Sequence, residues 1–485
     1  MTEDKNVENI DEASCQEIYP TKKRAFFGLS AVPDQLTYQA FTLLVFSYYF
    51  AVVGLDVLLV MGAYVVWGVW NAVNDPLLGA LSDRTKFKKK LGKRKLYLVI
   101  SIIPLSLIMV LLFSVPLGDD LLAFIYFIVM ILTFELIYTM WSVNVNAIFP
   151  EMFPNEQERA KTNIFVKGFT VLALICAMAI PPLVISPMVP VEENPSLETI
   201  QHFQMMYITA GLILASIILV TGLIFITKGV EEKEECIEDF EKRPGFIESL
   251  KSTLKNKTFL KFTIANMCIW YVFTTLITIF PLYSTWVLGI REDTYLITIA
   301  LLSAMIVAAL SLPLHMKLGS KIGMRNGLII TLLAWIAILF PYILLSDNAI
   351  SPYISIAITA CQGLSLSGAL FYVDILIGDV IDADEVEFGM KRSASYYGVN
   401  AFIHRFSQIF SILTIGIIFN GTGWSQYQPN PGTNVILGLK LIIFLFPAIA
   451  LTISILFLRS FRLTGDELAN MRVKLAELQS QRDNS

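Results

Sequence analysis

The chain has 485 residues, of which 55% are apolar and 16% are charged, and its formal net charge at pH 7 is -4. Soluble globular proteins carry about 25% charged residues, so this chain has too few polar side chains to cover a water-soluble particle. The composition indicates a membrane protein and excludes a disordered chain, a disulfide-rich secreted scaffold and a nucleic-acid-binding protein, and the five scattered Cys residues indicate no metal site.

Twelve apolar segments follow a polar N-terminal tail, residues 1–25, and each is long enough to cross a bilayer. A membrane-spanning helix needs about 20 apolar residues. Backbone polar groups in hydrocarbon must bond within their own segment, so helices are the expected form. The predicted spans are 26–53, 58–81, 96–115, 121–148, 163–186, 204–227, 260–288, 294–316, 326–346, 352–378, 395–419 and 435–458. The sequence therefore predicts an all-α integral membrane protein with twelve transmembrane helices.

The longest hydrophilic interior stretch, residues 228–259, separates the sixth predicted span from the seventh. It divides the chain into an N-terminal bundle, 26–227, and a C-terminal bundle, 260–463. Two six-helix halves with a site between them near the midplane is the architecture of major-facilitator transporters. The tail, 464–485, combines a capping-box pattern with Leu and Met at helical spacing, which predicts a short amphipathic cytoplasmic helix.

The basic residues predict the orientation of the spans. Of the 36 Lys and Arg residues, 32 lie in the tails or in loops on the same side as the tails, and Arg291 is the one residue on the other side. Because Lys and Arg concentrate in cytoplasmic loops, both termini are predicted to be cytoplasmic. We expect a monomer in the plasma membrane.

Ionisable residues are costly inside a bilayer and usually face the bundle interior. In the second span, Asn71, Asn74 and Asp75 have i, i+3, i+4 spacing and share one helical face. Thr139 on the fourth span could add a hydroxyl, and such hard oxygen ligands suit a small cation. Alternatively, Asp75 alone carries a proton, or it only pairs with Lys167 or caps a neighbouring backbone.

Three further charged residues are candidates for substrate binding. Asp34 on the first span lies at a depth similar to Asp75, and Lys167 and Arg405 could neutralise these acids across a common cavity. The alternative for Asp34 is a structural role beside Pro33. Lys167 and Arg405 would suit a carboxylated solute.

Glu135 on the fourth span either lines the transport path or forms a buried pair. Aromatic rings on spans expected to border the cavity could stack on a sugar face, although most rings in such a chain pack in the core or face lipid. These rings belong to Tyr38, Tyr138, Trp141, Trp270 and Tyr271.

Charged residues at the cytoplasmic face suggest an inner gate. Asp379 and Asp382 follow the tenth predicted span, and Asp83 and Arg84 follow the second. Ion pairs between these loops would hold the two halves closed.

Three segments carry a family resemblance. Residues 70–85, W-N-A-V-N-D-P-L-L-G-A-L-S-D-R-T, resemble the W-D-A-x-N-D-P-x-x-G-x-x-S-D-R-T motif of the glycoside-pentoside-hexuronide cation symporters, the melibiose permease family of the major facilitators. Residues 149–159 are similar to the L-P-E-M-T-x-x-x-x-E-R loop of that family, and residues 378–385 are similar to its A-D-V-V-D-Y-D-E segment. The segments follow in the family's order, and the likeness covers all twelve spans.

The resemblance implies a cation site at Asp75 and Asn74, with Thr139 contributing from the fourth span. Asn71 stands where the family commonly has a second carboxylate, so proton coupling or uncoupled transport is an alternative to sodium coupling. Ser142 and Asn146 stand where the melibiose permease has an acid and a tryptophan for the galactosyl group. The resemblance thus favours another glycoside, a pentose or a uronate over a melibiose-like galactoside.

The resemblance also implies that Asp34, Lys167 and Arg405 bind sugar or link the two halves. The expected function is secondary active transport of a sugar, glycoside or uronate by H⁺ or Na⁺ symport through alternating access. An uncoupled transporter or a lysolipid transporter of the same fold is the main alternative. A membrane enzyme is a remote one, because the chain has three His residues and no nucleotide-binding or metal motif. We therefore expect no catalytic residues and no cofactor other than the coupling ion.

Overall fold

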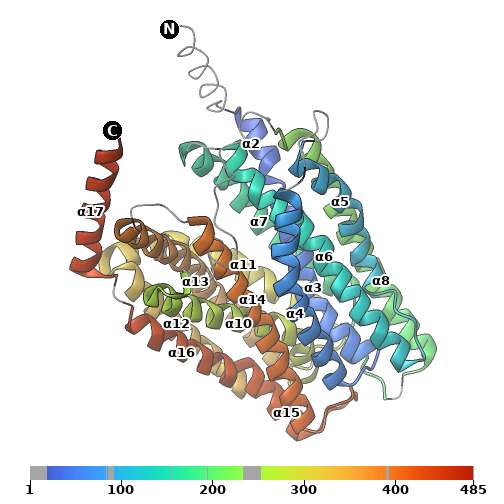
Figure 1. Cartoon of the computed structure of the whole chain (residues 1–485). Coiled ribbons are helices and arrows are strands. Elements are labelled where there is room, and N and C mark those ends of the chain that lie inside the picture. The colour runs from blue at the N-terminus through green and yellow to red at the C-terminus, as the bar shows by residue number, and fades with distance from the viewer. Residues whose placement is uncertain are drawn as a thin grey trace. The chain divides into compact units, whose positions relative to one another are not determined.

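The protein is described by a computed structural model in which every regular element of the described residues is a helix (Figure 1). Eleven helices within these residues are long and apolar enough to cross a membrane. The prediction of an all-helical, multi-pass membrane fold is therefore confirmed. The described residues are 19–83, 85, 92–153, 156–193, 195–232, 253–388, 393–461 and 463–483.

The chain divides into two compact units. The first unit comprises Met1–Leu55, Val65–Ile185 and Asn194–Arg243, and the second comprises Asp56–Tyr64, Ser186–Glu193 and Pro244–Ser485. Residues 1–18 of the predicted tail and 233–252 of the predicted linker lie outside the described residues. The cytoplasmic location of both termini stays a prediction.

The helices of the first unit follow the first six predicted spans. They are α2 (Thr21–Gly28), α3 (Ala31–Ser47), η1 (Tyr48–Val52), α4 (Val57–Asp83), α5 (Arg94–Leu111), α6 (Asp120–Met152), α7 (Glu156–Val184), α8 (Leu197–Ile224) and η2 (Phe225–Gly229). The start of α4, up to Tyr64, is assigned to the second unit, and the rest of this helix belongs to the first.

The predicted span 26–53 is divided, because α2 ends at Gly28 and a new helix starts at Ala31. From Ala31 the chain is helical through α3, of 17 residues, and the five-residue π turn η1. Pro33 lies in the first turn of α3, where a missing backbone N–H is tolerated.

Two buried tyrosines of η1 fix the C-terminal part of this helix to the end of α5. The Tyr48 hydroxyl donates to the Phe113 carbonyl at 2.7 Å, and the Tyr49 hydroxyl donates to the Leu112 carbonyl at 2.8 Å. Each bond satisfies both a buried phenol and a carbonyl that the end of a helix leaves without an intrahelical partner. These bonds position α3 within the first unit, where its aromatic residues meet α6.

The helices of the second unit follow the remaining six predicted spans. They are α10 (Lys257–Trp286), α11 (Tyr295–Ile322), α12 (Met324–Leu339), η5 (Phe340–Leu344), α13 (Ser351–Phe388), α14 (Ser393–Gly421), α15 (Thr433–Lys440), η6 (Leu441–Leu445), α16 (Phe446–Arg459) and α17 (Gly465–Asp483). Helix α17 is the helix that the pattern of the C-terminal tail predicts.

Helices α11 and α13 approach closely at glycines. A β-carbon at Gly363 would overlap the Ala304 carbonyl, and one at Gly368 would overlap the His315 ring. The His315 ring in turn lies within hydrogen-bond distance of the Leu364 carbonyl, 2.9 Å away. Small residues let two membrane helices pack backbone to backbone, where dispersion contacts stabilise the pair.

Replacing Gly363 with Ala is expected to lower the free energy of unfolding by about 1–3 kcal/mol, as overpacking does in well-packed cores. A backbone carbonyl cannot yield as a flexible side chain can. The thermal unfolding midpoint of the purified protein in detergent measures the effect. The control is Gly378→Ala on the same helix, where the β-carbon meets nothing within 4 Å, and its midpoint should be unchanged or higher. Equal midpoints for the two variants would contradict the close contact.

Candidate ion and solute site

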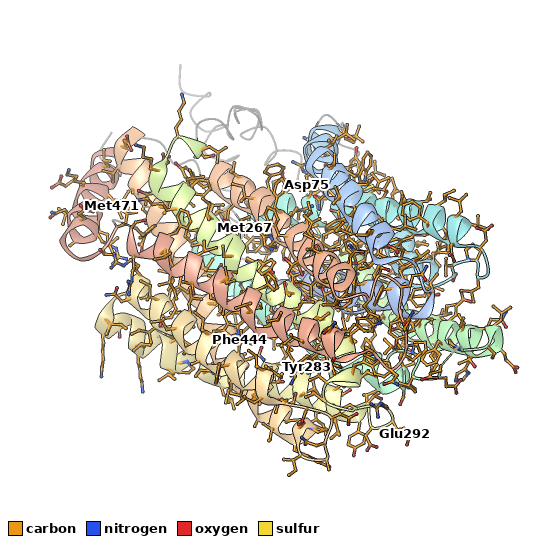
Figure 2. The ribbon with its side chains drawn as sticks, turned by 90° about the horizontal axis from the view of Figure 1, so that it is seen from below. Asp75, Met267, Tyr283, Glu292, Phe444 and Met471 are labelled. Atoms are coloured by element: carbon orange, nitrogen blue, oxygen red, sulfur yellow. The ribbon has the colours of Figure 1, made fainter. Side chains whose placement is uncertain are left out.

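A cluster of oxygen ligands lies between α4 and α6 in the first unit. Asp75, labelled on α4 in Figure 2, and Thr139 on α6 are joined by a hydrogen bond of 3.0 Å from the Thr139 hydroxyl to Asp75 Oδ1. The same hydroxyl lies 3.1 Å from Glu135 Oε1, one helical turn back on α6. The structure thus brings together two residues predicted for the cation site and adds a second carboxyl group.

Glu135 is completely buried and held at three points. Its Oε2 accepts a hydrogen bond of 3.0 Å from Trp67 Nε1, and its Oε1 faces Thr139. Its backbone carbonyl accepts one of 3.2 Å from Asn74 Nδ2. The sequence placed Glu135 on the fourth span but did not assign it to the cation site. Its i, i+4 spacing from Thr139 was the signal that could have done so.

The two amides of the predicted site are also buried on α4. Asn74 has no exposed surface and Asn71 is 2% exposed. Asn74 Oδ1 accepts no hydrogen bond within the described part of the chain, so one amide oxygen is available beside the carboxyl groups. The predicted set of Asp75, Asn71, Asn74 and Thr139 therefore shares one region of the first unit.

The hydrogen atoms of this cluster limit its charge state. The Thr139 hydroxyl carries one hydrogen and can donate to Asp75 or to Glu135, but not to both. Two ionised carboxyl groups around one hydroxyl would repel each other in a medium of low dielectric constant. A proton on one acid, or a cation among the oxygens, would reduce this repulsion.

Aromatic rings extend from this cluster along α3 and α6. The Phe41 ring stacks on Phe134 at 4.2 Å and lies 6.0 Å from Trp67, while Tyr138 lies 5.3 Å from Tyr38. Tyr138 is 7% exposed, and its ring lies near those of Tyr38 and Phe134. The row holds α3 against the part of α6 that carries Glu135 and Thr139.

Other predicted solute residues of the first unit have different environments. Trp141 is fully buried and packs against Phe225 at 5.6 Å, so in this conformation it belongs to the core. Ser142 and Asn146 lie one turn apart on α6, and Asn146 Nδ2 donates to Ser142 Oγ at 3.4 Å. The exposure of Asn146 leaves this pair accessible.

The predicted charged residues are spread over three helices. Asp34 on α3 accepts a hydrogen bond of 2.7 Å from Gln35 and is partly buried. Lys167 is exposed on α7 of the first unit, and Arg405 is partly buried on α14 of the second. Their proposed meeting across a common cavity stays a prediction.

A polar network joins the end of α4, the start of α5 and the end of α6. Ser82 bonds Asn144 at 2.5 Å and accepts from Arg94 at 2.8 Å, and Arg94 pairs with Glu151 at 3.2 Å. All but Glu151 are buried. The network gives Ser82 and Glu151, which belong to two of the family-like segments, a role in holding three helices together.

Three of the four predicted gate residues, Asp83, Asp379 and Asp382, lie within the described residues. Helix α4 ends at Asp83, and Arg84 lies outside the described residues. In the second unit, Asp379 is 5% exposed, and its Oδ1 lies 3.2 Å from Arg472 Nη2 of α17. Asp382 is half-buried on α13. The sequence did not indicate Arg472 as a partner of Asp379, because the two residues are 93 positions apart.

Comparison with known proteins identifies what the chain resembles. The family model described as "MFS/sugar transport protein" matches residues 26–465. A sodium-dependent lysophosphatidylcholine symporter 1 from Xenopus tropicalis is 23% identical, over 80% of this chain and 77% of its own. The uncharacterized symporter YjmB from Bacillus subtilis is 22% identical, over 93% of this chain and 94% of its own.

Solved structures share the fold. The nucleoside transporter NupG aligns with a TM-score of 0.62 at 14% identity, over 91% of this chain and 99% of its own. A single-substitution variant of the E. coli fucose:proton symporter, FucP, aligns with a TM-score of 0.53 at 13% identity, over 91% of this chain and 98% of its own. At such low identity these likenesses show the fold alone.

Proposed function

Because the chain belongs to the MFS/sugar transport protein family and is a multi-pass secondary transporter, we propose that it moves a sugar or sugar derivative by cation symport. The coupling ion, H⁺ or Na⁺, binds at Asp75, Glu135 and Thr139. The observation that carries this proposal is the pair of carboxyl groups sharing one hydroxyl. Alternating access then exposes this site and the solute site to each side of the membrane in turn.

The second carboxyl group bears on the choice of ion. With Asn71 in place of an acid, the α4 face alone offers one carboxylate, which suits a proton. Glu135 supplies another from α6, and two carboxyl groups with a hydroxyl and an amide oxygen also suit Na⁺. The plasma membrane is the expected location.

A second candidate solute is a lysolipid. It is favoured by the relative from Xenopus tropicalis, whose name gives lysophosphatidylcholine as its solute and sodium as its ion. The same ion site could serve either solute, because Asp75, Glu135 and Thr139 are proposed to bind the ion and not the solute.

Counterflow in proteoliposomes separates these solutes without any ion gradient. Vesicles are loaded with one unlabelled compound from a panel of methyl glycosides, pentoses, hexuronates and lysophosphatidylcholine, and entry of the same labelled compound is followed. We expect a saccharide or uronate to exchange faster than in protein-free vesicles. Exchange of lysophosphatidylcholine alone would replace the sugar proposal with the lysolipid one.

A further inference from the structure

The second unit contains a polar seam between α10 and α14. Near one end of the seam, the Thr275 hydroxyl lies 2.9 Å from Ser411 Oγ and 2.7 Å from the Tyr271 carbonyl of its own helix. The Tyr271 hydroxyl donates to Thr414 Oγ at 3.0 Å. Thr414 in turn donates to its own helix, to the Phe410 carbonyl at 2.8 Å. These hydroxyls bond one another and the backbone, so this part of the seam is explained by packing.

One level of the seam is different. Asn266, next to the Met267 labelled in Figure 2, donates from Nδ2 to Asn400 Oδ1 at 3.1 Å. Asn266 is 2% exposed, and its Oδ1 accepts no hydrogen bond from the described residues. One turn along each helix, the rings of Trp270 and His404 meet with their centroids 4.4 Å apart.

This level therefore has hydrogen-bonding capacity that packing does not use. Trp270, Asn400 and His404 are all partly exposed. In the described part of the chain, neither the Trp270 indole N–H nor a His404 ring nitrogen takes part in a hydrogen bond. The buried Asn266 Oδ1 costs free energy as long as it has no partner, and polar groups inside a membrane usually face a cavity or the bundle interior.

The unused groups have a mixed character. Asn266 Oδ1 accepts, the indole N–H donates, and a neutral imidazole does both. A cation would need acceptors only, and an acyl chain would need none of these groups. A hydroxyl both donates and accepts, and the apolar face of a sugar ring can pack on an aromatic ring. A polyhydroxylated ring fits all three groups.

We propose that Asn266, Trp270 and His404 form a saccharide-contacting subsite of the second unit, with Asn400 orienting the Asn266 amide. This inference rests on the proposed function, because it presumes that a saccharide is the transported solute. The proposed subsite places solute contacts on α10. None of the charged residues predicted to bind solute, Asp34, Lys167 and Arg405, lies on this helix.

The test is the KM for uptake of the saccharide that exchanges most rapidly in the panel. Trp270→Ala and Asn266→Ala should each raise KM about tenfold, the effect of losing a ring contact or a hydrogen bond to a buried partner. Trp270→Phe should raise it less, because it keeps the ring and loses the N–H. The matched control is Thr275→Val in the saturated part of the seam, for which KM should be unchanged.

The unfolding midpoint without solute separates contact from packing. Without solute, variants of the subsite should have unfolding midpoints near that of the unmodified protein. Added saccharide should raise the midpoint of the unmodified protein strongly and that of the variants much less. An unchanged KM in both alanine variants would overturn the subsite and leave ion-coupled transport standing. Accumulation of lysophosphatidylcholine with no exchange of any saccharide would also overturn it. If the unmodified protein only equilibrates the saccharide and never accumulates it, the proposed ion coupling is wrong. The KM values of the variants would still show whether Asn266 and Trp270 contact the saccharide.

Discussion

Asp75→Asn is expected to abolish ion-driven accumulation of solute while leaving exchange of solute across the membrane. The amide has the shape of the acid and can still accept the Thr139 hydrogen bond, so the fold should persist. It can neither release a proton nor hold negative charge for a cation. The ratio of internal to external solute should fall from at least about tenfold to one, which removes at least about 1.4 kcal/mol of stored free energy.

Accumulation and counterflow in the same proteoliposomes measure these two properties. Asp56→Asn is the matched control, because it makes the same chemical change just before α4. Asp56 Oδ1 accepts from the Leu58 N–H, and Asn serves equally well as a helix cap. Accumulation by Asp75→Asn at the parent's ratio, under every gradient, would show that Asp75 is not the coupling acid.

Glu135→Gln is expected to weaken binding of the coupling ion by about 10- to 100-fold, since hydrogen bonds to charged groups contribute about 1.5–3 kcal/mol. The amide keeps a partner for Trp67 Nε1 and for the Thr139 hydroxyl but removes one of the two acids. The concentration of Na⁺ or H⁺ that gives half-maximal uptake measures the change. Solute exchange at saturating ion should fall less.

Glu198→Gln, at an exposed position in the first turn of α8, provides the control for this change. Its ion dependence should match the parent's. If Glu135→Gln also keeps the parent's ion dependence, Glu135 is a structural partner of Trp67 and the ion site reduces to Asp75 and its neighbours on α4.

The sequence predicted the helices well because apolar length is enough to define a span. It missed the break between α2 and α3, because Gly28 and Ser30 are the only local signals of a helix end and a helix start within an otherwise apolar stretch. Capping and backbone geometry, and not hydropathy, decide where one helix stops and the next begins.

The grouping of residues at the candidate site follows from the sequence only in part. The spacing of Asn71, Asn74 and Asp75 indicates a shared face, because helical geometry is local. That Glu135 joins this face depends on how α4 and α6 pack. The burial of Trp141 against Phe225 depends in the same way on how α6 packs against η2. Such contacts link residues more than 60 positions apart, and a single sequence does not encode them in any short pattern.

Solute accumulation by the unmodified protein under an imposed ion gradient tests the central claim most directly. Proteoliposomes containing the protein are given the exchanging solute with an inward Na⁺ gradient or an inward H⁺ gradient, each imposed separately. We predict that solute rises above its external concentration under one of these gradients and returns to equilibrium when an ionophore collapses that gradient. Simple equilibration at the same rate under both gradients, and with none, would contradict coupled transport.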